Sequence, residues 1–347
     1  MTPTDLDIVI TGRAAISAAG VGLPPLEEVV RNGRSCLQPL PDDLSGETAA
    51  RWGRTEGFRV NDFMPPLKAR KFDRCSQFAV AATGMALKDA GVDTAGIDPV
   101  RIGIVLGCGF GGIANSSEFL SGYFTAGVDG LSPMLFPNTV ANAPASNASI
   151  EHGIKGPNVT IVQRFCSAET ALMIACRYLE EGRADLVVTG GVDEVTPLMI
   201  KGFGSMGQLM RYAGGFGEGC GLLVLERRES ASRRGATVKG MLDAVRTVGL
   251  ILPESEQEGV DRLIPPARSW SRISLSGTAD LTHSLTSRLH VAPRLELARL
   301  TGRSLAMGGL SLIALLLSLK EGEKGLHLAA SPEGPYVSLD VTGGPPV

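Results

Sequence analysis

The sequence holds 347 residues, which is enough for two domains or one large double domain. Its 33 basic and 36 acidic side chains nearly cancel, and aromatic residues make up 5% of the chain. A nucleic-acid-binding surface is therefore not expected, because such a surface needs a basic face and usually aromatic stacking platforms.

The spacing of the cysteines and the length of the apolar segments predict the cellular location of the protein and whether it binds a metal. Six cysteines are scattered along the chain without a Cys-x-x-Cys pair or another metal-ligand spacing, which favours reduced thiols in the cytoplasm and no metal site. No basic stretch with a following apolar run opens the sequence, so no signal peptide is expected. The longest apolar block, residues 310–319, is too short to span a bilayer. We expect a cytoplasmic protein without membrane contact.

Hydrophobic periodicity and glycine or proline punctuation predict alternating strands and helices. Strands are expected first at residues 7–11, 101–106, 158–162, 185–189 and 222–226, with helices at 26–32, 69–90, 116–125, 141–153 and 167–180. Later strands are expected at 238–248, 271–275, 325–329 and 336–341, with helices at 295–300 and 305–320. The alternation predicts an α/β fold. A charged run at 226–235, typical of a solvated helix face, separates the predicted domains 1–230 and 231–347.

Cys166 stands between a predicted strand and a predicted helix. A β-branched run precedes it, and apolar side chains recur at helical spacing after it. A thiol at a helix N-terminus is favoured as thiolate by the helix dipole and the free N–H groups. Cys166 is thus a candidate nucleophile. The alternative is a structural role, since free cysteine is among the residues most often buried.

Gly107, Gly109 and Gly112 satisfy the G-x-G-x-x-G pattern of dinucleotide-binding folds. That use also needs an acidic residue at the end of the next strand, about 20 residues further on. Asp129 lies at this distance, but in a predicted loop with no strand before it. Close approach of the backbone to a neighbouring segment is therefore the preferred interpretation, and no cofactor is expected.

Eight blocks of sequence resemble the β-ketoacyl synthases of the thiolase fold, in the same order and at similar spacing. These blocks are residues 8–12, 72–77, 101–105, 132–137, 142–145, 156–158, 185–191 and 217–221. The resemblance covers most of residues 6–230. It implies two βαβαβαββ halves stacked as a five-layer αβαβα sandwich. It also implies a dimer in which the strand before Cys166 pairs with its counterpart across the two-fold axis.

A working member of this family uses a cysteine nucleophile and two histidines, and the resemblance indicates where these fall. Cys166 holds the nucleophile position. The first histidine segment, His-Gly-Thr-Gly-Thr, is matched with Ser276 at the histidine, and the second, Thr-Gly-His-x-x-Gly-Ala-x-Gly, with Arg303. The expected lysine falls on Ala298. No counterpart of the C-terminal Gly-Phe-Gly-Gly-x-Asn loop is found in residues 328–341.

These replacements remove most of the family's chemistry. Arginine does not lose its proton at working pH, so Arg303 cannot act as a base, and the Ser276 hydroxyl carries no positive charge. Each lost group typically costs about 100- to 10,000-fold in rate. The four histidines, His152, His283, His290 and His327, lie outside both segments. His283 is the nearest to a missing position, and we expect a surface histidine there.

The first functional hypothesis is a non-catalytic partner that resembles a chain-length factor. Such a subunit pairs with an active ketosynthase, meets the acyl carrier protein only through that partner, and lines part of the acyl tunnel. The resemblance places the following residues at the interface or the tunnel: Phe110, Phe119, Phe136, Asn138, Asn142, Arg164 and Phe165. Ordinary core packing is the alternative for each. Many chain-length factors replace the cysteine, often with glutamine, whereas this chain keeps it.

The second hypothesis is a cysteine-dependent acyltransferase or thioester hydrolase. The helix N-terminus and the nearby Arg164 would favour a Cys166 thiolate that an acyl-thioester could acylate. Neither hypothesis identifies the product or its acyl length. An intact Cys-His-His synthase that copurifies with this chain favours the first, and acylation of Cys166 favours the second.

Overall fold

The structure is a computed structural model that describes residues 7–45, 50–92, 96–208, 215–266, 268–277, 283–289, 292–331 and 334–345. Its earlier strands are β1 (Ile8–Ser17), β2 (Gly20–Val21), β3 (Gln38–Pro39), β4 (Arg51–Gly53), β5 (Ile102–Cys108), β6 (Asn158–Ile161), β7 (Leu186–Asp193), β8 (Phe216–Gly217) and β9 (Gly219–Arg227). The helices between them are α1 (Leu23–Asn32), α2 (Asp42–Ser45), α3 (Pro66–Ala69), α4 (Arg74–Asp89), α5 (Ile113–Ala126), α6 (Ala143–Glu151), α7 (Ser167–Glu180) and α8 (Pro197–Ser205).

The later part of the chain repeats the alternation on a smaller scale. Its strands are β10 (Gly240–Val248), β11 (Arg272–Gly277), β12 (Arg294–Leu295), β13 (Lys324–Ala330) and β14 (Tyr336–Gly343). Its helices are α9 (Arg228–Arg233), α10 (Glu256–Leu263), α11 (His283–Arg288), α12 (Ala298–Thr301) and α13 (Gly308–Leu317). In the described part of the chain, no helix is long and apolar enough to cross a membrane.

Two sets of strands follow the same order, which is the internal repeat that the resemblance implies. The first runs β6-β5-β7-β9-β1 and the second β12-β11-β13-β14-β10. Each has two parallel pairings followed by two antiparallel ones. A short antiparallel pairing of β1 with β10, from Ile8 to Ile10, joins the two sets. The domain boundary at residue 230 lies between β9 and β10 and stays a prediction.

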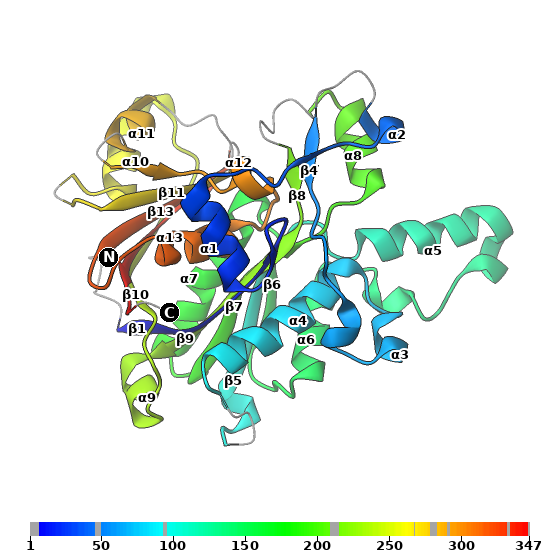
Figure 1. The fold of residues 1–347 in the computed structure, drawn as a ribbon, viewed down its shortest axis with the longest axis horizontal. Helices are drawn as coiled ribbons and strands as arrows, with labels where there is room; N and C mark the ends of the chain where they lie inside the picture. The colour runs from blue at the N-terminus through cyan, green and yellow to red at the C-terminus, as the bar shows by residue number, and fades with distance from the viewer. Residues whose placement is uncertain are drawn as a thin grey trace.

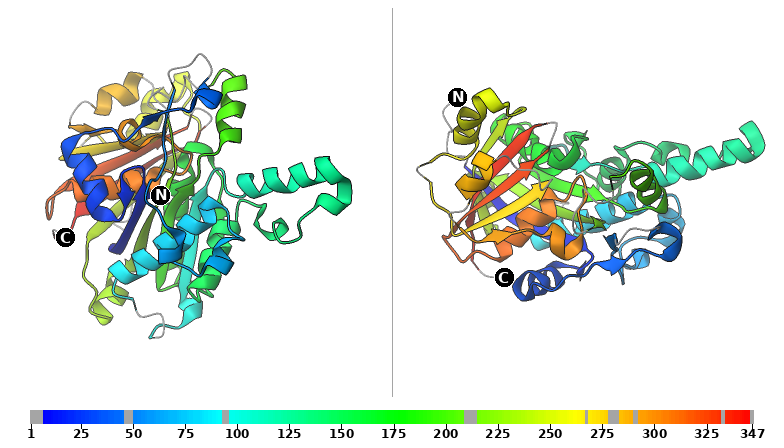
Figure 2. Two further views of the ribbon diagram at one scale, coloured as in Figure 1. Left: turned by 45° about the vertical axis from the view of Figure 1, so that its right-hand side comes forward. Right: turned by 90° about the horizontal axis from the view of Figure 1, so that it is seen from above.

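Three apolar cores separate the layers of the sandwich (Figures 1 and 2). One core packs α4 and α6 against the first set of strands. The central core holds α7 and α13 between the two sets, with Val187 from one side and Leu339 from the other. The third packs α10 and α11 against the second set. This arrangement is the predicted five-layer αβαβα sandwich, and the α/β fold class is confirmed.

Local chemistry explains where elements begin. The prediction for α7 is confirmed over its whole length. The helix predicted from residue 69 begins instead at Arg74, because the Asp73 side chain accepts a hydrogen bond from the backbone N–H of Ser76 and caps it. Helices α10 and α11 lie in stretches for which no helix was predicted. The 295–300 prediction is wrong at its start, where β12 lies, and right only over the short α12.

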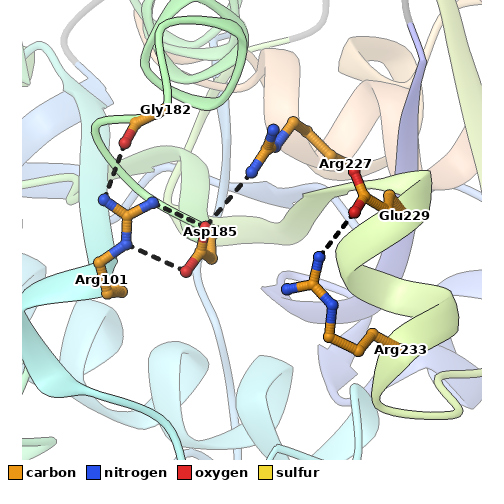
Figure 3. Close-up of polar contacts among 6 residues, drawn as sticks. All are labelled: Arg101, Gly182, Asp185, Arg227, Glu229 and Arg233. Carbon is orange, nitrogen blue, oxygen red and sulfur yellow. Dashed lines mark hydrogen bonds and ion pairs between the residues drawn. The ribbon is translucent and has the colours of Figure 1, made fainter.

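An ion-pair network fastens one end of the first set of strands (Figure 3). Arg101, just before β5, donates to both carboxylate oxygens of Asp185, just before β7, at 3.0 and 2.7 Å. Arg227, at the end of β9, lies 3.5 Å from the same carboxylate. The hydrogen bonds from Arg101 lower the pKa of Asp185. A separate pair, Arg233 with Glu229, spans one turn of α9.

Helix α5 projects away from the rest of the molecule (Figures 1 and 2). It presents large apolar side chains to solvent together with the segment that returns to the body. The most exposed among them are Phe124 at 80%, Val128 at 75% and Phe136 at 63%. Strand β6 ends the order of the first set, so one of its edges has no neighbouring strand in the described structure. Exposed apolar groups beside an open strand edge are typical of a surface that a partner covers.

Candidate active site around Cys166

Cys166 occupies the position that the sequence predicts, at the start of α7. A short 3-10 turn, Arg164–Cys166, connects β6 to this helix. Arg164 adopts a φ of 47°, which is a strained conformation for a residue with a side chain. Ser167 fastens the turn, because its Oγ accepts from the N–H of Gln163 at 2.8 Å and donates to the carbonyl of Arg164 at 2.7 Å. The turn holds Cys166 in one orientation.

The Cys166 thiol is buried and is not poised as a nucleophile. Its exposed fraction is 0%, and Sγ donates a hydrogen bond of 3.1 Å to the carbonyl of Pro335. Burial, and next the charge of Glu169, raise the pKa of the thiol. The prediction that the helix N-terminus and Arg164 favour thiolate is therefore wrong. A dipole effect confined to the first turn does not outweigh desolvation and a carboxylate one turn away.

Ser276, which we predict at the position of the first missing histidine, lies near the end of β11 and points into a buried polar group. Its Oγ donates to Oε1 of Glu169 at 2.6 Å. Glu169 comes from α7, three residues after Cys166, and its exposed fraction is 0%. The hydroxyl thus bonds a carboxylate instead of facing the thiol.

A histidine does lie in this region, but a different one from that expected. His327, on β13, is fully buried, and its Nε2 lies 2.8 Å from Oε1 of Glu169. Its Nδ1 lies 3.2 Å from Oγ of Ser274. We had taken His283 as the nearest histidine; its side chain and all of His290 lie outside the described residues.

Hydrogen bonds connect the side chains of this buried group. Ser274 Oγ donates to the carbonyl of Ser311 and lies 3.2 Å from Nδ1 of His327. Oε1 of Glu169 accepts from the Ser276 hydroxyl and lies 2.8 Å from Nε2 of His327. The result is a buried, hydrogen-bonded Glu169–His327 pair. Ser276 and Glu169 face the same ring nitrogen, whereas a Ser-His-acid triad needs the hydroxyl and the acid on opposite nitrogens.

The glutamate lies at the N-terminus of α13. A Cβ on Gly308, the first residue of this helix, would come within 2.0 Å of Oε1 of Glu169, so only glycine fits there. The helix dipole favours the negative charge at this end. Glu169 therefore joins α7, α13, β11 and β13 at a point next to Cys166. Sequence reasoning missed Glu169, although an acid on the apolar face of α7 signals a buried partner.

The sequence of this chain is similar to that of a known protein family. Residues 5–231 match the family model of the β-ketoacyl synthase N-terminal domain. The chain belongs to the β-ketoacyl synthase family. A Synechocystis sp. 3-oxoacyl-(acyl-carrier-protein) synthase 2 is 30% identical over 251 residues, which are 67% of this chain but only 60% of that relative. The synthase of the same name from Staphylococcus aureus is 26% identical, over 97% of this chain and 91% of that one.

Solved structures with the same fold include two that contain ketosynthases. One is described as a type II polyketide synthase acyl-carrier protein in complex with its ketosynthase, and matches with a TM-score of 0.83 at 18% identity over 97% of this chain and 99% of that chain. Another is the ishigamide ketosynthase/chain length factor, with a TM-score of 0.79 at 22% identity over 97% and 99% of the two chains. These likenesses establish the ketosynthase fold.

Arg303 is the residue that we predict at the second histidine position of this family, and this assignment stays a prediction. The side chain is largely buried. Its backbone forms an isolated parallel bridge with Phe216, with the Arg303 N–H donating to Gly215 at 2.9 Å and its carbonyl accepting from Gly217 at 2.9 Å. The arginine thus sits in a segment bound to the other half of the synthase fold.

The residues predicted for the synthase interface are half-buried, exposed or buried. Phe110 and Phe119 are half-buried, with ring contacts to Phe203 at 5.9 Å and Phe136 at 5.8 Å. Arg164 and Asn142 are exposed. The buried members are Asn138, which donates to the carbonyl of Lys71 at 3.1 Å and accepts from Asn147 at 2.7 Å, and Phe165. Their tunnel or interface role stays a prediction.

The glycine loop of this synthase fold binds an aspartate rather than a nucleotide phosphate. The N–H groups of Gly109 and Phe110 donate to Oδ1 of Asp193 at 2.8 Å each, and that of Ala306 to Oδ2 at 2.8 Å. A Cβ at Gly107 would lie 2.4 Å from the backbone nitrogen of Ala168, which is the close approach that we predicted. Burial raises the pKa of Asp193 to about 6.

Three potential metal ligands meet nearby, although no metal site was predicted. The thiols of Cys75 and Cys108 and a carboxylate oxygen of Asp193 lie within 4.8 Å of one another. Both oxygens of Asp193 already accept backbone hydrogen bonds. Burial raises the pKa of Cys75 well above its ordinary value, which opposes the thiolate that a metal needs. We therefore assign no metal to this group.

Proposed function

We propose that the chain is a non-catalytic, chain-length-factor-like partner of an active β-ketoacyl synthase in fatty-acid-type or polyketide biosynthesis. The observation that carries the proposal is the buried Glu169–His327 pair, which bonds Ser276 at the first expected histidine position. The same region holds the Cys166 thiol against a carbonyl. A condensing site needs free imidazoles beside a thiolate, and here the imidazole of this region, that of His327, is hydrogen-bonded to the carboxyl group of Glu169.

The Cys166 thiol is buried away from solvent, and its surroundings raise its pKa instead of lowering it. A buried thiol with a raised pKa is a poor nucleophile, because the thiolate is the reactive form. The thiol donates a hydrogen bond to the carbonyl of Pro335. Pro335 belongs to residues 328–341, in which we find no counterpart of the family's glycine-rich C-terminal loop. The hydroxyl of Ser276 likewise donates its hydrogen bond to Glu169. Condensation by this chain alone should be negligible.

The exposed apolar side chains near β6 and on α5 support the proposal that a partner subunit binds there. The open edge of β6 lies next to Val162, which is 59% exposed, and α5 carries Phe124. An edge strand and large apolar side chains together are costly to leave in water. In the heterodimer that we propose, β6 pairs with the partner's equivalent strand, and Phe119 and Phe136 contribute to the wall of a shared acyl tunnel. The carrier protein would bind through the active subunit in the cytoplasm.

The second candidate is an acyltransferase or thioester hydrolase that uses Cys166. The cysteine itself, on a strained turn at a helix N-terminus, is what favours it. Its burial and raised pKa count against it, as does the arrangement of Ser276 and Glu169 on one ring nitrogen of His327. We therefore place it second.

Co-expression with a Cys-His-His synthase encoded beside this chain tests the proposal. We expect the two proteins to copurify, and intact-complex mass measurement to give one copy of each. The purified heterodimer should condense malonyl and acyl thioesters on its carrier protein, whereas this chain alone should not. A stable homodimer that condenses without the other protein would contradict the proposal.

A further inference from the structure

A cavity of about 410 Å³ opens far from Cys166, between the end of α4, helix α9 and the start of β10. Helices α4 and α9 approach each other at the lower left of Figure 1. The cavity is lined by Arg13, Lys88, Asp89, Ala90, Gly91, Arg234, Gly235, Ala236, Thr237, Lys239 and Pro345. Four of these side chains are cationic and one is acidic. Its volume falls in the range of small-molecule sites.

Two of the cations are neutralised by acids of the chain. Arg234 donates to Oε2 of Glu226 at 2.8 Å and to the carbonyl of Ala90 at 2.9 Å. Lys239 donates to the carboxylate of Asp89. These bonds shape the wall and leave the cavity with a surplus of positive charge from the remaining two.

Arg13 is the cation with the greatest need of an anion. Its exposed fraction is 4%, and its buried Nε has no hydrogen-bond partner among the described residues. Only its backbone N–H bonds Asp89, at 2.8 Å. Asp89 and Glu27 interact with its charge, but burial outweighs both and lowers the pKa of the guanidinium. Arginine stays charged even so, and a buried charge without bonded partners is costly.

Further donors complete the lining. Lys88 is exposed, and its side-chain ammonium makes no hydrogen bond or ion pair with another residue that the structure describes. Thr237, which also lines the cavity, is exposed and offers a hydroxyl. A guanidinium, an ammonium and a hydroxyl around one cavity are the donors that phosphate oxygens accept from.

We propose that this cavity binds a small phosphorylated molecule with two phosphate groups, held by Arg13 and Lys88. The space exceeds that of a single phosphate, and the two donors come from different elements, Arg13 from β1 and Lys88 from α4, so we assign one phosphate to each. Such a ligand would satisfy the buried guanidinium of Arg13 and bind without contact to Cys166. The site is independent of the function proposed above.

Titration calorimetry with inorganic pyrophosphate, on the protein in its native assembly and at constant ionic strength, tests the site. We expect saturable binding of one pyrophosphate per chain, weakened at least about 10-fold by Lys88→Glu and by Arg13→Met. Lys68→Glu is the matched control, because Lys68 is a surface lysine paired with Glu151 at 2.8 Å and should leave binding unchanged.

Pyrophosphate should also raise the melting temperature of the natural protein more than that of the Lys88→Glu variant. Because Lys88 is exposed, this substitution should leave the folded core intact. If Arg13→Met fails to fold, Lys88→Glu still decides. Equal affinity for sulfate at the same ionic strength would overturn the proposal, and so would a dissociation constant that Lys88→Glu leaves unchanged.

Discussion

His327→Ala should lower the free energy of unfolding by about 3–5 kcal/mol, because it leaves a cavity in the core and removes a hydrogen-bond partner of the buried Glu169 side chain. The variant leaves the carboxylate of Glu169 fully buried with Ser276 as its remaining side-chain donor. The loss is large because this pair connects both sets of strands through α7 and β13. Urea unfolding followed by circular dichroism measures it.

His152→Ala is the matched control, since that half-buried imidazole makes a single 2.8 Å hydrogen bond, to the carbonyl of Val80. We expect it to cost about 1 kcal/mol. Replacing Glu169 and His327 together by leucine should cost clearly less than the sum of the two single changes, because no lone charge is left behind. A cost below about 1 kcal/mol for His327→Ala would show that the pair is not formed.

Val162→Asp should weaken association with the partner synthase by at least about 100-fold, which corresponds to about 3 kcal/mol. Val162 follows the open edge of β6 and is 59% exposed in the single chain. In the proposed heterodimer it would be buried, and an aspartate there would lose its water without a partner. Analytical ultracentrifugation of the purified pair measures the dissociation constant.

Leu252→Asp provides the control for charge itself. Leu252 is 44% exposed and precedes α10 by four residues, and α10 lies on the side of Figure 1 opposite to α5. This change should therefore leave association and folding nearly unaltered. If Val162→Asp associates as tightly as the natural chain while Leu252→Asp does not, the interface lies elsewhere and the role of β6 is wrong.

The strands and helices near Cys166 could be predicted from sequence because their signals are local. The β-branched run predicts β6, and the apolar spacing after Cys166 predicts α7 to the residue. Family motifs separately indicated what Ser276 and Arg303 replace. The strand and the helix on either side of Cys166 were therefore predictable from sequence, whereas the roles of Ser276 and Arg303 stay predictions.

The Glu169–His327 pair could not be predicted in the same way. The two residues are 158 positions apart, and the pairing of β11 with β13 and the packing of α7 against α13 bring them together. The sequence did contain a sign of each, an acid on an apolar helix face and a histidine within a buried strand. The buried polar group can be identified only once the contact between Glu169 and His327 is known. The predicted lowering of the Cys166 pKa is reversed by burial, which the sequence does not show.

Activity of the assembled heterodimer with one cysteine removed at a time tests the central claim most directly. Condensation should survive Cys166→Ala nearly unchanged and disappear when the nucleophilic cysteine of the partner synthase is replaced by alanine. Loss of condensation in the Cys166→Ala complex, with acyl groups found on Cys166 in the natural one, would contradict the account.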